Sequence, residues 1–235
     1  MKHHSLVTAL LGAAALLTGC GGGGTGGYMP MMNLSSAPGE MALVNFLQAA
    51  HQNMLNASYS GNNYSLTVSF APNAGTTTFN GSAPAYSTVE TVTLSKNGTV
   101  VTTGVSTAYF LLNPYMPLGQ VASSGSPYAV VVTSSPLPTT ISVGTSGAFD
   151  TLTYYHDSTK ATIDADESIS YSVMANNSTT LLFCLNSTFS NVTAQGMTDG
   201  LANGTENDCY TVDATGTANV SSITVTVAGT MLTFQ

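Results

Sequence analysis

The sequence predicts a mainly β protein: an antiparallel sandwich or barrel of about ten short strands with one N-terminal amphipathic helix. From Tyr59 onward, runs rich in Val, Thr, Ile, Tyr and Phe alternate with clusters of Gly, Asn, Pro and Ser. This alternation is typical of strands joined by turns. The strand-like runs do not alternate with helical segments, so a parallel α/β sheet is not expected.

Helical periodicity is confined to the segment 38–56. Its apolar residues recur at spacings of three and four, which places them on one face of a helix. These residues, with one histidine among them, are Met41, Val44, Leu47, His51, Met54 and Leu55. Pro38 suits the first helical turn, and Glu40 lies near the positive end of the helix dipole. We interpret His51 as a side chain at the edge of the core.

The strands that follow are predicted from period-two alternation and from turn residues. Asn97-Gly98, between two alternating runs, is the strongest hairpin signal in the chain. Residues 81–89 resemble residues 144–152 at an offset of 63, which suggests two β-units over about 59–127 and 128–235. The expected strands are 64–70, 88–94, 99–105, 129–133, 139–143, 152–156, 169–174, 180–185, 210–213, 222–228 and 231–234.

Composition excludes one large class of function. Charged residues make up 6% of the chain, against roughly 25% in an ordinary soluble protein. The three basic residues are all lysines, and the net charge is −8. Neutralising a row of phosphates requires many basic side chains, so a nucleic-acid partner is excluded.

The first twenty residues have the pattern of an export signal. Lys2 and two histidines precede an apolar run over 5–17, which is too short as a helix to cross a hydrocarbon core of roughly 30 Å. Leu17-Thr18-Gly19-Cys20 follows directly. This motif resembles the lipobox of bacterial lipoproteins. The resemblance implies that the signal peptide is removed and that Cys20 carries the lipid.

The resemblance also implies a location and a domain organisation. Gly21 follows the cysteine where an aspartate would retain an enteric lipoprotein at the inner membrane, so we expect a lipid anchor in the cell outer membrane, on its periplasmic face or at the cell surface. We divide the chain into a signal peptide (1–19), a lipidated flexible tether (20–37) and a β-rich head domain (38–235). The glycine-rich start of the tether favours flexibility.

Two cysteines, Cys184 and Cys209, remain besides Cys20. An exported chain with two spare cysteines most simply pairs them, so we predict a structural disulfide.

No catalytic template is complete, and we predict that the protein is not an enzyme. His156-Asp157-Ser158 brings suggestive residue types together, but neighbours along a strand face opposite sides, so we interpret the tripeptide as a turn. If an unrecognised active site exists, its candidates are His51, His156 and the acids near Asp164.

Metal sites and cofactors are not expected either. Zinc-type spacings are missing, and Asp164, Asp166 and Glu167 lack the rest of a calcium loop, which leaves calcium binding at these acids as an open alternative.

The predicted function is that of a membrane-anchored envelope lipoprotein acting as a structural or binding module. Its expected partners are the membrane, through the N-terminal lipid, and an envelope protein or a glycan. One alternative is a carrier that holds an apolar ligand in a β-barrel cavity. A second alternative is an enzyme with an unrecognised site.

Overall fold

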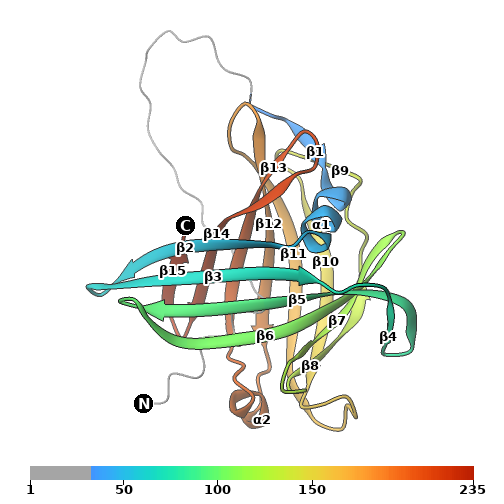
Figure 1. Cartoon of the computed structure of the whole chain (residues 1–235), viewed down its shortest axis with the longest axis vertical. Coiled ribbons are helices and arrows are strands. Elements are labelled where there is room, and N and C mark those ends of the chain that lie inside the picture. Colours follow the sequence, from blue (N-terminus) through green and yellow to red (C-terminus); the bar gives the residue numbers. More distant parts are fainter. Residues whose placement is uncertain (1–32) are drawn as a thin grey trace.

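The computed structural model describes residues 33–235 and confirms a mainly β, antiparallel architecture (Figure 1). The predicted signal peptide, Cys20 and most of the predicted tether lie outside the described residues. No helix within the described range is long and apolar enough to cross a membrane.

Two short helices and fifteen strands make up the described chain. The helices are α1 (Gly39–Gln48) and α2 (Ala194–Thr198). The strands are β1 (Ser36–Pro38), β2 (His51–Tyr59), β3 (Asn62–Pro72), β4 (Thr77–Phe79), β5 (Ser82–Lys96), β6 (Thr99–Leu112), β7 (Tyr115–Ala122), β8 (Tyr128–Ser134), β9 (Thr140–Ser142), β10 (Ser146–Tyr155), β11 (Ile163–Ala175), β12 (Thr180–Ser190), β13 (Gly204–Asp213), β14 (Ala218–Val227) and β15 (Thr230–Phe234).

Twelve strands form one antiparallel sheet that curls into a nearly closed barrel, more strands than the sequence predicted. Their order is β15-β14-β13-β12-β11-β10-β8-β7-β6-β5-β3-β2, and β4 pairs with β5 beside this path. The two outermost strands meet where Asn56 and Gln235 exchange two backbone hydrogen bonds of 3.0 Å. This contact covers part of each sheet edge, which is otherwise free to pair with other chains.

The sheet runs without interruption through the point where the sequence suggested two β-units. Strand β7 pairs with β8, with Gly119 opposite Val130. Strand β1, at the end of the predicted tether, pairs with β9 outside the barrel sheet.

The predicted helix over 38–56 is wrong beyond Gln48. From His51 the chain forms β2, which pairs with β3 along its whole length. Leu55 is buried while its neighbour Met54 is 63% exposed, the alternation of a strand. Backbone hydrogen bonds between β2 and β3 therefore decide the structure of this segment, although the spacing of its apolar residues also fits a helix.

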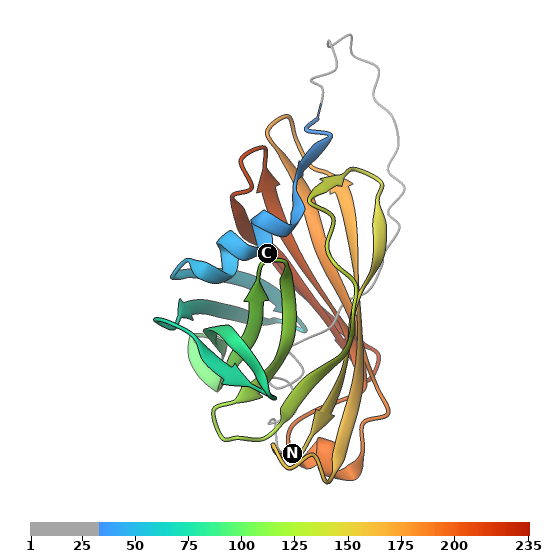
Figure 2. The same ribbon diagram turned by 90° about the vertical axis from the view of Figure 1, so that its right-hand side faces the viewer.

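The two helices lie toward opposite ends of the barrel (Figure 1; Figure 2). Helix α1 packs against β3, β9 and β14. Its buried side chains include Leu43 and Phe46, and Phe46 contacts the rings of Phe70 and Tyr210. Helix α2 contacts β11 instead. Hydrophobic residues from α1 and both halves of the sheet thus share the barrel interior.

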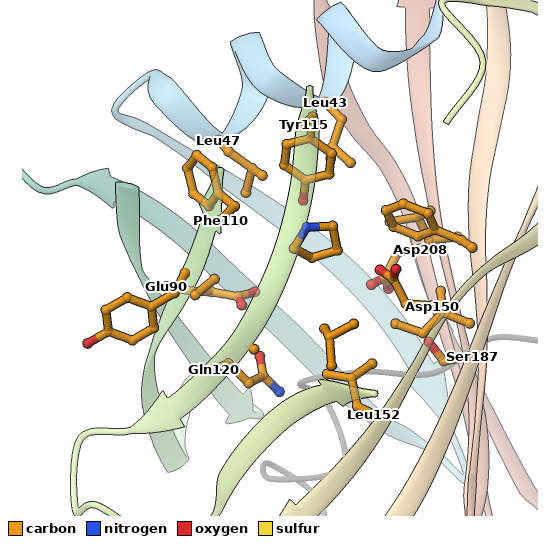
Figure 3. Close-up of a pocket in the computed structure, with 18 of the residues that line it drawn as sticks. Leu43, Leu47, Glu90, Phe110, Tyr115, Gln120, Asp150, Leu152, Ser187 and Asp208 are labelled. Atoms are coloured by element: carbon orange, nitrogen blue, oxygen red, sulfur yellow. The ribbon is translucent and has the colours of Figure 1, made fainter. Parts of the chain in front are cut away.

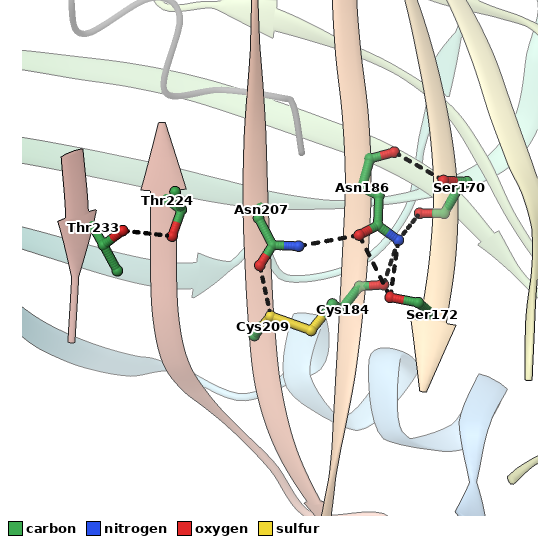
Figure 4. Close-up of a disulfide and its surroundings, with 8 residues drawn as sticks. All are labelled: Ser170, Ser172, Cys184, Asn186, Asn207, Cys209, Thr224 and Thr233. Atoms are coloured by element: carbon green, nitrogen blue, oxygen red, sulfur yellow. Dashed lines mark hydrogen bonds between the residues drawn. A yellow bond between two sulfur atoms is a disulfide. The ribbon is translucent and has the colours of Figure 1, made fainter. Parts of the chain in front are cut away.

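Two local predictions are confirmed. Asn97 and Gly98 have φ values of 50° and 80°, as a tight hairpin turn between β5 and β6 requires. Cys184 and Cys209 lie directly opposite each other on β12 and β13 and form a disulfide (Figure 4). Beside it, Asn207 donates to Asn186 with an N···O distance of 3.0 Å, so polar side chains link the same two strands.

Candidate functional site

A cavity of about 180 Å³ lies inside the barrel, beneath α1 (Figure 3). Its walls are largely apolar and aromatic, and Leu43, Phe46 and Leu47 of α1 contribute to them. The aromatic residues in the wall are Phe46, Phe70, Tyr109, Phe110, Tyr115, Phe149 and Tyr210. An engineered apolar cavity of roughly 150 Å³ holds one benzene molecule, so this space admits one small ring-sized ligand.

Four carboxyl groups line the cavity. Glu90 comes from β5, Asp150 from β10, Glu167 from β11 and Asp208 from β13. In Figure 3, Glu90 reaches in from one wall, and Asp150 and Asp208 reach in from the opposite wall. A fifth acid, Glu206 on β13, is 1% exposed and interacts with Asp208.

The interior acids have few hydrogen-bond donors. Glu167 accepts from the hydroxyl of Tyr154 at 2.8 Å, and the amide of Gln120 donates to that hydroxyl at 2.7 Å. At least one buried oxygen on each of four acids accepts no hydrogen bond: Asp150, Glu167, Glu206 and Asp208. A buried polar atom without a partner costs roughly 1–3 kcal/mol, more when the group is charged.

No positive charge in the described wall offsets these acids. The lining residues include no lysine, arginine or histidine. Lys96 lies with its Nζ 5.6 Å from the ring centroid of Tyr64, and the Nζ of Lys160 donates to Asn80 at 2.6 Å. Both described lysines thus interact elsewhere.

Burial raises the pKa of every interior acid, and the few hydrogen bonds to Asp150 and Glu167 offset this only in part. Burial raises the pKa of Asp150 to about 7 and that of Glu167 to about 7. Burial raises the pKa of Asp208 to about 7, and burial together with the charge of Asp208 raises that of Glu90 to about 8. The pKa of Glu206 rises well above its usual range for the same reasons. Near neutral pH this cluster therefore holds several protons that it can release.

The cavity combines two features that suit an organic cation. The carboxyl groups supply negative charge beside largely apolar walls, and aromatic faces attract cations by their quadrupole. Tyr115 and Tyr210 remain neutral because burial raises the pKa of both hydroxyl groups. A cation entering the cavity would replace protons on the acids, so no net charge would have to be buried.

The structure separates the three acids considered for calcium. Glu167 points into the cavity, whereas Asp166 accepts hydrogen bonds from Thr153 and Asn191. Asp164 lies instead near His156 and Asp199.

The two histidines named as candidates lie in different environments. The ring of His51 stacks on Phe70 with centroids 4.9 Å apart, and its Nδ1 lies 2.7 Å from the carbonyl oxygen of Ala49. His156 follows β10, where its Nδ1 lies 2.6 Å from Asp199 and 3.2 Å from Ser126. Both partners meet the same ring nitrogen, so the imidazole does not bridge serine and aspartate as a catalytic triad requires.

Sequence reasoning missed Glu90, Asp150 and Asp208. A signal was present, because each stands two residues before an inward-facing hydrophobic side chain, respectively Val92, Leu152 and Tyr210. Residues two apart in a strand share a face, so each acid had to point inward. That the acids meet in one cavity follows only from the strand order.

The chain matches no known family model, and no curated protein or solved structure is similar to it. The fold and the cavity therefore carry the functional conclusion.

Proposed function

We propose that this protein is a lipid-anchored binding protein of the bacterial envelope whose barrel holds a small organic cation. The observation that carries the proposal is the cavity of about 180 Å³ lined by aromatic rings and four carboxyl groups, with no basic residue in its described wall. A purely apolar ligand gains nothing from buried carboxyl groups that accept too few hydrogen bonds. A ligand with a ring-sized apolar body and one ammonium group uses both features.

Binding a cation in this cavity is coupled to proton release. The four lining acids have pKa values raised to about 7 or 8, so the cation competes with protons near neutral pH. If one proton is released per cation, affinity rises up to about tenfold per pH unit until the acids are ionised.

Calorimetric titration with benzylammonium and with benzyl alcohol, its neutral analogue, tests the proposal. We expect the ammonium compound to bind at pH 8 and to bind about tenfold more weakly at pH 6, while the alcohol binds far more weakly at both. Equal affinity for the two compounds, or no binding of either, would contradict an organic-cation site. Tighter binding of calcium than of benzylammonium would make the site one for metal ions.

A matched pair of variants on one strand controls for general effects of charge. Glu167→Gln removes a carboxyl group from the cavity, and Asp166→Asn removes its neighbour, which does not line the cavity. We expect Glu167→Gln to weaken benzylammonium binding at least tenfold and Asp166→Asn to change it less than twofold.

The anchor part of the proposal rests on the lipobox at Leu17-Thr18-Gly19-Cys20. Acyl chains contribute roughly 0.8 kcal/mol per buried CH₂, so a multiply acylated Cys20 would hold the protein at a membrane. Cys20→Ala should move the protein from the detergent phase to the aqueous phase in a phase-partition assay. A variant that stays with membranes would contradict the anchor.

A further inference from the structure

A second cluster of ligand-type side chains lies outside the cavity, next to α2. It consists of His156, which follows β10, Asp164 at the start of β11, and Asp199, which follows α2. The Nδ1 or Nε2 of the histidine and one carboxylate oxygen from each aspartate all lie within 4.8 Å of one another. Asp199 thus joins two residues from either side of the turn between β10 and β11, although it lies 35 positions beyond Asp164.

Asp164 is the residue that points to a ligand. It is 0% exposed, and neither of its carboxylate oxygens has a hydrogen-bond partner. The group it faces is the carboxyl group of Asp199, so the two form a hydrogen bond with each other only while they share a proton. Lys160 is close in sequence, but its Nζ donates to Asn80. A buried carboxylate without a donor is costly, and a cation bound between the two aspartates would remove that cost.

The surrounding backbone holds the three residues in place. Thr193 donates its backbone N–H to the carbonyl oxygen of Asp164 at 2.8 Å, which fixes α2 on β11. A Cβ at Gly196 would lie 2.4 Å from the same oxygen, so only glycine permits this approach. On the other side, His156 donates its N–H to Thr162 at 3.0 Å and closes the turn between β10 and β11.

The polar side chains around the cluster also suit a bound ion. The amide of Gln195 lies 3.2 Å from both carboxylate oxygens of Asp199, to which it donates. Ser126 lies 3.2 Å from Nδ1 of His156. Hydrogen bonds of this kind orient the ligands of protein metal sites.

We propose that His156, Asp164 and Asp199 form a binding site for one divalent transition-metal ion of the zinc type. An imidazole nitrogen with two carboxylates suits zinc, whereas calcium takes six to eight oxygen ligands. Ligand atoms around one tetrahedral zinc lie about 3.3 Å apart. Atoms of the cluster that are up to 4.8 Å apart must therefore draw closer, and the 2.6 Å contact between Nδ1 of His156 and Asp199 must open. The side chain of His156 is 44% exposed and follows a strand end, which leaves it room to move. Its exposure also leaves a coordination position open to water or to another molecule.

Titration of the full-length protein in detergent with zinc, after treatment with a chelator, tests this site. We expect one zinc ion to bind to the cluster, and we expect Asp164→Asn to weaken that binding at least a hundredfold. His156→Gln is the second variant, since a change at a half-exposed side chain leaves the fold intact, and it should have a similar effect. Asp157→Asn, next to the histidine but outside the cluster, should change zinc affinity less than twofold.

Cobalt reports on the ligands themselves. Substitution with Co²⁺ should give visible absorption bands of a four- or five-coordinate site with nitrogen and oxygen ligands, and these should vanish in Asp164→Asn. The proposal is overturned if zinc does not bind, or if it binds equally well to wild type and to both cluster variants, which would assign the zinc to another site. Displacement of zinc by an equal concentration of calcium would also overturn it.

This site is independent of the proposed cation cavity. Glu167→Gln should leave zinc binding unchanged, and Asp164→Asn should leave benzylammonium binding unchanged. Failure of either experiment therefore leaves the other proposal standing.

Discussion

The barrel uses its acidic residues in two opposite ways. Asp213, the last residue of β13, accepts hydrogen bonds from the backbone N–H groups of Thr215 and Thr217, at 2.8 and 3.0 Å. These bonds and that from the Thr215 hydroxyl lower its pKa, and hydrogen bonds from Thr159 do the same for Asp157. Asp150 and Glu167 are buried with few donors, and burial raises the pKa of each.

The difference shows what each group contributes to the fold. A carboxylate in a turn stabilises the chain by accepting hydrogen bonds, so its charge favours folding. A carboxyl group in the cavity opposes folding once it ionises. Acids that oppose folding and still occupy four barrel strands point to a role in binding.

The largest expected effect that tests this contrast is the pH dependence of stability. In the unfolded chain these acids titrate near pH 4, whereas in the folded barrel the four lining acids titrate at about 7 or 8. The free energy of unfolding is therefore highest below pH 4, where the acids are protonated in both states, and it falls as the pH rises toward 8. We expect the melting temperature to fall by about 15 °C or more between pH 5 and pH 8. A melting temperature that is flat or rises over this range would contradict ionisable interior acids.

Asp150→Asn should remove the part of the pH dependence of stability that comes from Asp150. The pKa of Asp150 is raised from 3.8 to about 7, which corresponds to on the order of 4 kcal/mol opposing folding at high pH. The variant should therefore be more stable than wild type at pH 8 and differ little at pH 4. Urea unfolding at both pH values measures the two differences, and equal differences would show that charge is not the cause.

Removing the disulfide should shift stability without changing its pH dependence. Cys184 and Cys209 tie β12 to β13, the strand that carries Asp208, across a sequence separation of 25 residues. In the chain-entropy model this cross-link is worth about 3.5 kcal/mol. The double variant Cys184→Ser, Cys209→Ser should lose a similar amount at pH 5 and at pH 8. A loss confined to one pH would indicate that the disulfide also positions the acids.

Asp213→Ala should give the smallest effect, with the opposite dependence on pH. The wild-type carboxylate has a lowered pKa, so its contribution is present above pH 4 and is lost in acid. We expect the melting temperature to fall by about 2–4 °C at pH 7 and to be unchanged near pH 2. A larger loss at low pH than at neutral pH would contradict the role of its charge.

Most strands could be predicted from the sequence because their pattern is local. The run 64–70 alternates in period two and lies within β3, and Asn97-Gly98 supplies the positive φ angles of the hairpin. Strand β7 was missed because Pro117 and Gly119 interrupt its pattern, and these residues occur at irregular points where the pairing register shifts. The error at His51 arose because short apolar spacings fit both a helix and a strand.

The candidate sites were harder to predict than the strands. Glu90 and Asp208 stand 118 positions apart in the sequence, and only the closure of the barrel brings β5 and β13 to opposite walls of one cavity. His156 was noted for its neighbours Asp157 and Ser158, yet its partner is Asp199, 43 residues away. Adjacency along the chain does not predict contact between side chains on extended strands.

By itself the sequence determined the β class, most of the strands, the Asn97-Gly98 turn and the pairing of Cys184 with Cys209. These depend on residue type, alternation and counting, which are local properties of a chain. Only the tertiary structure decided that segment 51–59 forms a strand and not a helix. It also decided that the buried acids converge and that Asp164 lies beside Asp199. The physical reason is that a barrel wall is made of hydrogen bonds between distant strands, and their register decides which side chains share a space.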